Sequence, residues 1–254
     1  MSKLIRDTRL LLTMHIQDTL RNPVFLIMGL VQPVIWLLLF APLLEGLMHV
    51  PGFEGSHAIG FFAPGLLVML AVVSTLFAGM GVINDVREGI IEKLRVTPVA
   101  RFALPLSLIA RDGIMLMMQM GMLLLIGALL GLRPDPVGLA LMFPLIMLVG
   151  LFVASISYIL ALSLKNEYAL SGAANFFLLP LVLLSGISLP LTLGPPFLQL
   201  LGSINPFSHA VNAARALSQG HLAHTAVSSG FVLFAMLFAL AFIWSARSFR
   251  RISR

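Results

Sequence analysis

The sequence contains no cysteine among its 254 residues, and charged side chains make up only 10% of it. Without Cys the chain forms no disulfide, holds no thiolate-bound metal and has no Cys nucleophile. It also lacks the G-x-x-x-x-G-K-[ST] loop that cradles phosphates, since none of Lys3, Lys93 and Lys165 follows a glycine. We therefore expect this chain neither to bind a cofactor nor to act as an enzyme.

Long stretches without Asp, Glu, Lys or Arg account for most of the chain. They cover 22–44, 55–84, 113–132, 137–164, 168–214 and 216–246. A bilayer core takes about 20 apolar residues as helix, and one charge at its centre costs roughly 2.5–3.5 kcal/mol. With 59% hydrophobic residues overall, the pattern predicts an all-α membrane protein with six transmembrane helices.

The expected spans are 23–44, 61–84, 104–131, 137–164, 169–190 and 225–246. The long tract 168–214 is too interrupted for one helix, because Pro180, Pro190 and the Gly194-Pro195-Pro196 run break it. We expect one span followed by short helical pieces in 195–220. Irregular backbone at membrane depth is tolerated only beside protein or a water-filled cavity.

The distribution of basic residues predicts the orientation. Of the 16 Lys and Arg residues, all but Arg133 and Arg215 fall in four segments: 1–21, the connection after the second span up to Arg111, Lys165, and the tail from Arg247. By the positive-inside rule we expect both termini to be cytoplasmic. We expect the chain to lie in the cytoplasmic (inner) membrane. The net charge of +6 lies at helix ends, which indicates contact with membrane lipids and not with nucleic acid.

Two cytoplasmic segments carry patterns of their own. In 2–21, Ile5, Leu12, Ile16 and Leu20 form an apolar stripe, which predicts a helix lying at the membrane interface. The alternative is an ordinary cytoplasmic extension.

The second segment, 85–100, is expected to form a short helix that begins near Asn84 and ends before Pro98. It combines an apolar edge with dense mixed charge, which suits docking onto a protein. The alternative is a solvated helix end.

Four motifs occur in order along the chain. They are Asn22-Pro23 with Gln32-Pro33-x-x-Trp36, Phe62-Ala63-Pro64-Gly65, Arg87-Glu88-Gly89-x-x-Glu92-x-Leu94-x-x-Thr97-Pro98, and Asn205-Pro206-Phe207 with Arg215. On a six-span plan this combination resembles the type-2 ABC exporter permeases. It is most similar to the membrane subunit of daunorubicin-resistance-type drug exporters.

The resemblance implies a single permease domain over 1–254, with an interface helix at 2–21, a coupling helix at 85–100 and outer re-entrant helices at 195–220. It implies that two permease subunits, alike or merely similar, pair with cytoplasmic ABC ATPase subunits that bind ATP and Mg. The residues implied for coupling to the ATPase are Arg87, Glu88, Glu92, Lys93, Leu94, Arg95, Thr97 and Pro98. Those implied for the outer re-entrant region or gate are Asn205, Pro206 and Arg215.

We expect export of hydrophobic or amphipathic, drug-like molecules. Export of a lipid-linked glycan or polysaccharide is the main alternative. An ion-coupled secondary transporter is disfavoured, because the spans are expected to hold no ionisable group apart from flanking His. Arg215 is interpreted as an outer anchor that reaches the interface, with a role in a gate left open. His221 and His224 lack a third ligand nearby in sequence, so no metal site is expected.

Overall fold

The computed structural model describes residues 2–21, 24–45, 58–89, 100, 102–187 and 194–252. All regular structure in this part of the chain is α-helical, so the predicted all-α class is confirmed. The helices are α1 (Ser2–Arg21), α2 (Val24–Glu45), α3 (Ala58–Leu76), α4 (Gly79–Arg87), α6 (Ala103–Leu129), α7 (Pro136–Leu164), α8 (Glu167–Leu183), α9 (Pro196–Ile204), α10 (Pro206–Ser218) and α11 (Thr225–Ile252).

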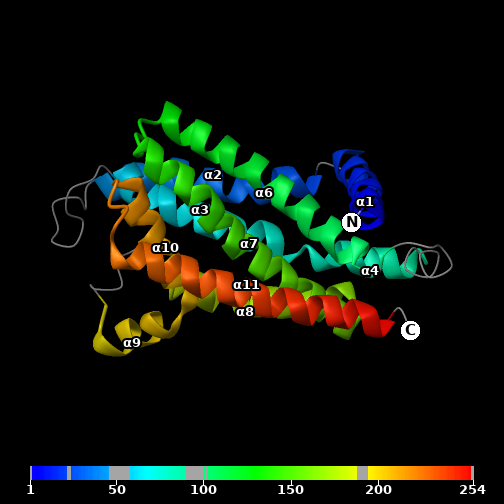
Figure 1. Ribbon diagram of the computed structural model, residues 1–254. Coiled ribbons are helices and arrows are strands. Elements are labelled where there is room, and N and C mark those ends of the chain that lie inside the picture. Colours follow the sequence, from blue (N-terminus) through cyan, green and yellow to red (C-terminus); the bar gives the residue numbers. More distant parts are fainter. Residues whose placement is uncertain are drawn as a thin grey trace.

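Most of these helices run along one common axis and form an elongated bundle (Figure 1). The helix α1 lies at one end of the bundle, together with α4 and the C-terminal end of α11. The short helices α9 and α10 lie at the opposite end. The chain therefore starts and finishes at the same end.

The centre of the bundle is formed by α3 and α7. The helix α7 packs against α3, α4, α6, α10 and α11. On α3, Phe62, Leu66, Val68 and Leu70 are completely buried although they point to different sides of the helix. A helix that is apolar all round belongs in the interior of a bundle.

Four helical segments are long and apolar enough to cross a membrane by length and composition: Ile59–Arg87, Ala103–Leu129, Pro136–Leu164 and Thr225–Phe249. In the rest of the described chain the same measure finds only shorter apolar stretches, Leu30–Leu39 and Glu167–Leu183. Several membrane-spanning helices are thus present, and the count of six stays a prediction.

The second expected span is two helices, α3 and α4, with a break at Phe77 and Ala78. Asp85 continues α4, so the expectation of a new helix beginning near Asn84 is wrong. Gly89 adopts φ +69° after the last turn of α4, a left-handed conformation that ends helices and suits glycine. Of the predicted coupling helix 85–100, residues 90–99 lie outside the described residues.

Two further expectations need correction. The helix α8 ends at Leu183, before the predicted limit of 190, and Gly186 has φ +73° in the turn that follows. More importantly, α6 carries Arg111 and Asp112 within its length. The expectation that the spans hold no ionisable group beyond flanking His is therefore wrong. The two opposite charges are tolerated inside the bundle because they neutralise each other.

Candidate functional site

The predicted coupling segment leaves and rejoins the bundle at two points that are each tied to another helix. Arg87, the last residue of α4, forms an ion pair with Glu167, the first residue of α8. At the other side, the backbone N–H of Ala100 donates to Oδ2 of Asp7 on α1 at 3.0 Å. The two ends of the segment are thus connected to α8 and α1.

Of the residues implied for ATPase coupling, the structure describes Arg87 and Glu88. Both are exposed, and Glu88 is the C-cap of α4. The remaining members of the set lie outside the described residues: Glu92, Lys93, Leu94, Arg95, Thr97 and Pro98.

The outer residues Asn205 and Pro206 begin α10. The Oδ1 of Asn205 accepts from the N–H of Phe207 at 3.0 Å and so caps the helix. Pro206 occupies the first turn, where its fixed φ suits a helix and its missing N–H costs nothing. The Nδ2 of Asn205 also donates to the carbonyl oxygen of Leu181 at 3.1 Å, which joins α10 to the last turn of α8.

Arg215 makes the same connection from the other end of α10. Its Nη2 donates to the carbonyl oxygens of Gly186 at 2.7 Å and Ile187 at 3.2 Å, just beyond α8. Its Nε donates to the carbonyl oxygen of Phe61 on α3 at 3.2 Å. The side chain is thus directed into the bundle, which favours a tie between three elements over an anchor that reaches outward.

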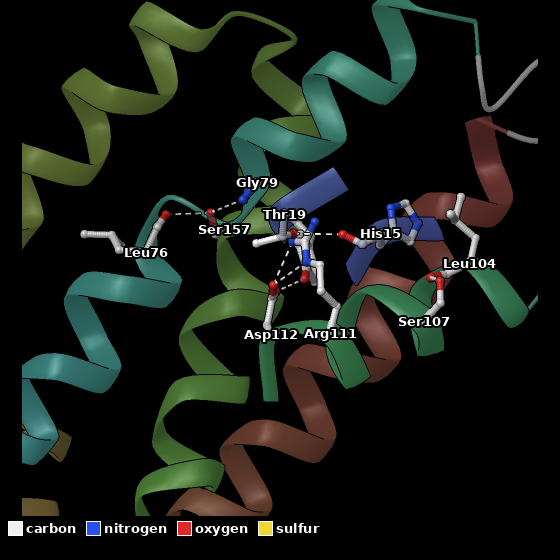
Figure 2. A network of polar contacts seen from close by, with 10 residues as sticks. His15, Thr19, Leu76, Gly79, Leu104, Ser107, Arg111, Asp112 and Ser157 are labelled. Atoms are coloured by element: carbon white, nitrogen blue, oxygen red, sulfur yellow. Dashed lines mark hydrogen bonds and ion pairs between the residues drawn. The ribbon is translucent and has the colours of Figure 1, made fainter. Parts of the chain in front are cut away.

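Sequence reasoning missed a polar network at the other end of the bundle, where α1, α4, α6 and α7 meet (Figure 2). Arg111 donates through Nε at 2.9 Å and Nη2 at 2.7 Å to Oδ1 of Asp112. The other oxygen of Asp112 accepts from the hydroxyl of Tyr158, which is completely buried. A methyl group placed on Gly81 would lie 3.4 Å from Nη1 of Arg111, so α4 packs directly over this guanidinium.

From α1 the network is bordered by His15, which is 4% exposed. Burial, with the positive charge of Arg111 as the second cause, lowers the pKa of His15 from 6.5 to about 4. The imidazole is therefore neutral at pH 7, and its Nε2 is buried without a hydrogen-bond partner. The charge pair inside α6 and the rare Tyr158, one of two tyrosines in the chain, were the available signals for this network.

Residues 6–218 match the family described as ABC-2 type transporter. The chain belongs to this family. The matched range includes both the end of α4 and the Asn205–Arg215 region, so both candidate regions lie within the ABC-2 type sequence.

Two similar proteins are named as permeases. The chain is 29% identical over 200 residues to the putative transport permease ycf38 of Cyanophora paradoxa, covering 78% of this chain and 69% of that protein. It is 28% identical over 203 residues to the daunorubicin resistance ABC transporter permease protein DrrB1 of Streptomyces coeruleorubidus, covering 78% and 70%. The resemblance predicted from the four motifs is confirmed.

The charged side chains of these regions make contacts between helices. No group of three or more His, Cys, Asp or Glu among the described residues could hold a metal ion. Arg87 pairs with a carboxylate, Asp7 accepts from a backbone N–H, and Arg215 donates to backbone carbonyls. Such contacts join one helix to another.

Proposed function

We propose that this chain is the permease subunit of an ATP-driven exporter that moves hydrophobic or amphipathic, drug-like molecules out of the cytoplasm. The ABC-2 match over residues 6–218 carries the proposal. The similarity to a daunorubicin resistance permease supports export and a drug-like substrate. ATP and Mg are bound by a separate cytoplasmic ABC ATPase subunit, and this chain binds no cofactor.

Coupling to the ATPase is assigned to the segment from Arg87 to Pro98. The support is mechanical, because both ends of the segment are connected to other helices. The Arg87–Glu167 ion pair links its start to α8, and the Asp7–Ala100 hydrogen bond links the chain just after Pro98 to α1. A displacement imposed on the segment by a docked ATPase would therefore reach both helices.

The proposed setting is the cytoplasmic membrane, with both termini inside. The placement of α1 and the end of α11 at one end of the bundle (Figure 1) agrees with termini on one side. Basic residues at that end would contact lipid headgroups. The helices α9 and α10 are then the outer re-entrant pieces, joined to α3 and α8 through Asn205 and Arg215. Two copies, or this chain and a similar permease, form the transport unit.

The substrate class follows from the chemistry of the spans. Their outward faces are apolar, with exposed Phe176, Phe177, Met236 and Leu240 among them. Arg111 and Asp112 satisfy each other, so this pair offers no free charge to a substrate. Such surfaces bind by apolar area and a few hydrogen bonds, which gives broad specificity.

The test uses the chain reconstituted with its ATPase in inside-out vesicles. We expect a lipophilic dye to accumulate in the vesicles on addition of ATP, and no accumulation with an ATPase that cannot hydrolyse it. Translocation of a lipid-linked glycan with exclusion of the dye would replace the drug assignment. Transport driven by an ion gradient without any ATPase would refute the exporter assignment altogether.

A further inference from the structure

The helical hydrogen-bond ladder is broken between α3 and α4. The N–H of Ala78 bonds to the carbonyl of Thr75 at 3.1 Å, and the N–H of Met80 bonds to that of Phe77 at 3.0 Å. Both bonds reach back three residues where an α-helix reaches back four. The carbonyl of Leu76 and the N–H of Gly79 are therefore left over at the centre of this break.

A single hydroxyl from α7 forms hydrogen bonds with both of these groups. The Oγ of Ser157 donates to the carbonyl oxygen of Leu76 at 2.6 Å and accepts from the N–H of Gly79 at 2.9 Å (Figure 2). Ser157 is completely buried, so no water competes for either bond. By contrast, the equally buried Ser155 donates to Leu151 of its own helix.

The backbone at the break is shaped for this contact. A methyl group on Gly79 would lie 2.4 Å from the carbonyl oxygen of Ser157 and 2.9 Å from Cβ of Ala161. Only glycine therefore allows α4 to approach α7 closely enough for the hydroxyl to reach both groups. The serine on α7 and the glycine at the start of α4 are complementary parts of one joint.

The joint lies between the core of the bundle and the proposed coupling segment. On one side is α3, packed in the bundle centre; on the other is α4, whose last residue Arg87 leads into the segment. The neighbour of Ser157, Tyr158, holds Asp112 and through it Arg111 beneath Gly81 of α4. Two successive residues of α7 thus position α4: Ser157 bonds to its first residue, and Tyr158 acts through Asp112 and Arg111 near Gly81.

We propose that Ser157 is a positioning residue for transport: by bridging the broken ladder it sets the angle between α4 and α3. A displacement of the coupling segment then moves α3 in a defined way. It is not absorbed by bending of the chain between α3 and α4. The inference rests on the proposed function for the origin of that displacement, whereas the angle itself is a property of this chain alone.

The angle is tested by a distance between α4 and α7, which packs along α3, and the measurement needs no ATPase. Because the chain has no Cys, Asn84→Cys and Ser163→Cys, both exposed, give spin labels on α4 and α7. Dilution with unlabelled chain removes distances between copies. We expect one narrow distance distribution in the doubly labelled chain, and the same distribution when Ser155→Ala is added. Adding Ser157→Ala should broaden or shift it. An unchanged distribution with Ser157→Ala would overturn the proposal.

The functional role is tested by dye molecules transported per ATP hydrolysed, in vesicles containing the ATPase. We expect Ser157→Ala to lower this ratio at least fivefold while ATP hydrolysis stays within twofold, and Ser155→Ala to leave it unchanged. Gly79→Ala keeps the hydroxyl but separates α4 from α7, and should give the same loss.

Three results would count against Ser157. They are full coupling in Ser157→Ala, full coupling in a folded Gly79→Ala if Ser157→Ala aggregates, and an equal loss in Ser155→Ala. Absence of ATP-driven transport by the unsubstituted chain refutes the proposed function, and the distance measurement then decides the role of Ser157 by itself.

Discussion

Arg215 contacts Phe61 in two ways: its guanidinium carbon lies 3.7 Å from the centre of the ring, and its Nε donates to the carbonyl oxygen of the same residue. The same guanidinium also donates to the carbonyl oxygens of Gly186 and Ile187 beyond α8. Carbonyl oxygens carry partial negative charge, so they stabilise this partly buried cation together with the aromatic face. One side chain of α10 thus joins the start of α3 to the end of α8.

Replacing Arg215 by Lys keeps the charge but removes the planar group that donates in several directions. We expect Arg215→Lys to lower the free energy of unfolding by roughly 3 kcal/mol, the value of one or two hydrogen bonds from a charged group. Thermal unfolding in detergent measures the effect. Arg133→Lys, at an exposed loop position, is the control and should change nothing. Equal melting temperatures for the two variants would show that the Arg215 contacts carry no stability.

The hydroxyl of Tyr158 is expected to stabilise the Asp112 carboxylate in the bundle. Tyr158→Phe removes one donor to a buried charged acceptor and should cost about 1.5–3 kcal/mol. Asp112→Ala leaves Arg111 buried without its carboxylate and should cost more, about 3–5 kcal/mol. The control is Tyr168→Phe, because that side chain is 88% exposed. Denaturation in mixed micelles gives the values, and a Tyr158→Phe chain as stable as Tyr168→Phe would refute the assignment.

The helical class was predictable from the sequence, because long charge-free runs are visible without knowledge of any contact. The network around Arg111 was not, since counting basic residues assigns Arg111 to a loop unless its neighbour Asp112 and the distant Tyr158 are known to neutralise it. The inward direction of Arg215 was equally hidden, because its hydrogen-bond partners are backbone carbonyls, which any residue carries. The need for glycine at position 79 could likewise not be predicted, because it depends on the close approach of Ser157 on α7.

Stability at low pH should depend on His15. Its pKa is about 4 in the folded chain against an ordinary 6.5, so the unfolded chain takes up the proton first as the pH falls. The stability contributed by neutral His15 is complete above pH 6.5 and declines as the pH falls from 6.5 to about 4, by up to roughly 3 kcal/mol. His15→Gln should flatten the loss seen between pH 7 and pH 5 in thermal unfolding. The exposed His221→Gln should retain it; the same loss in both variants would exclude His15 as its source.

The proposed topology predicts which positions are labelled from outside the cell. Because the chain has no Cys, single substitutions give unambiguous labelling by a membrane-impermeant thiol reagent. We expect Gly52→Cys and Gly194→Cys to react in intact cells, and Thr97→Cys and Arg254→Cys to react only after the membrane is opened. Reaction of Thr97→Cys from outside would overturn the orientation and with it the assignment of the coupling segment.

Charge reversal in the coupling segment should separate membrane insertion from transport. Glu88 is exposed at the end of α4, and Glu88→Lys combined with Glu92→Lys reverses two charges of the proposed coupling segment. Opposite charges across an interface favour the right partner, and like charges disfavour it. We therefore expect normal amounts of folded chain in the membrane, loss of dye transport, and loss of substrate-stimulated ATP hydrolysis. Lys165→Glu is the control, because it reverses an exposed charge outside the segment, just before α8, and should leave transport unchanged. Full transport by the double variant would remove the segment from the mechanism, whatever drives the exporter.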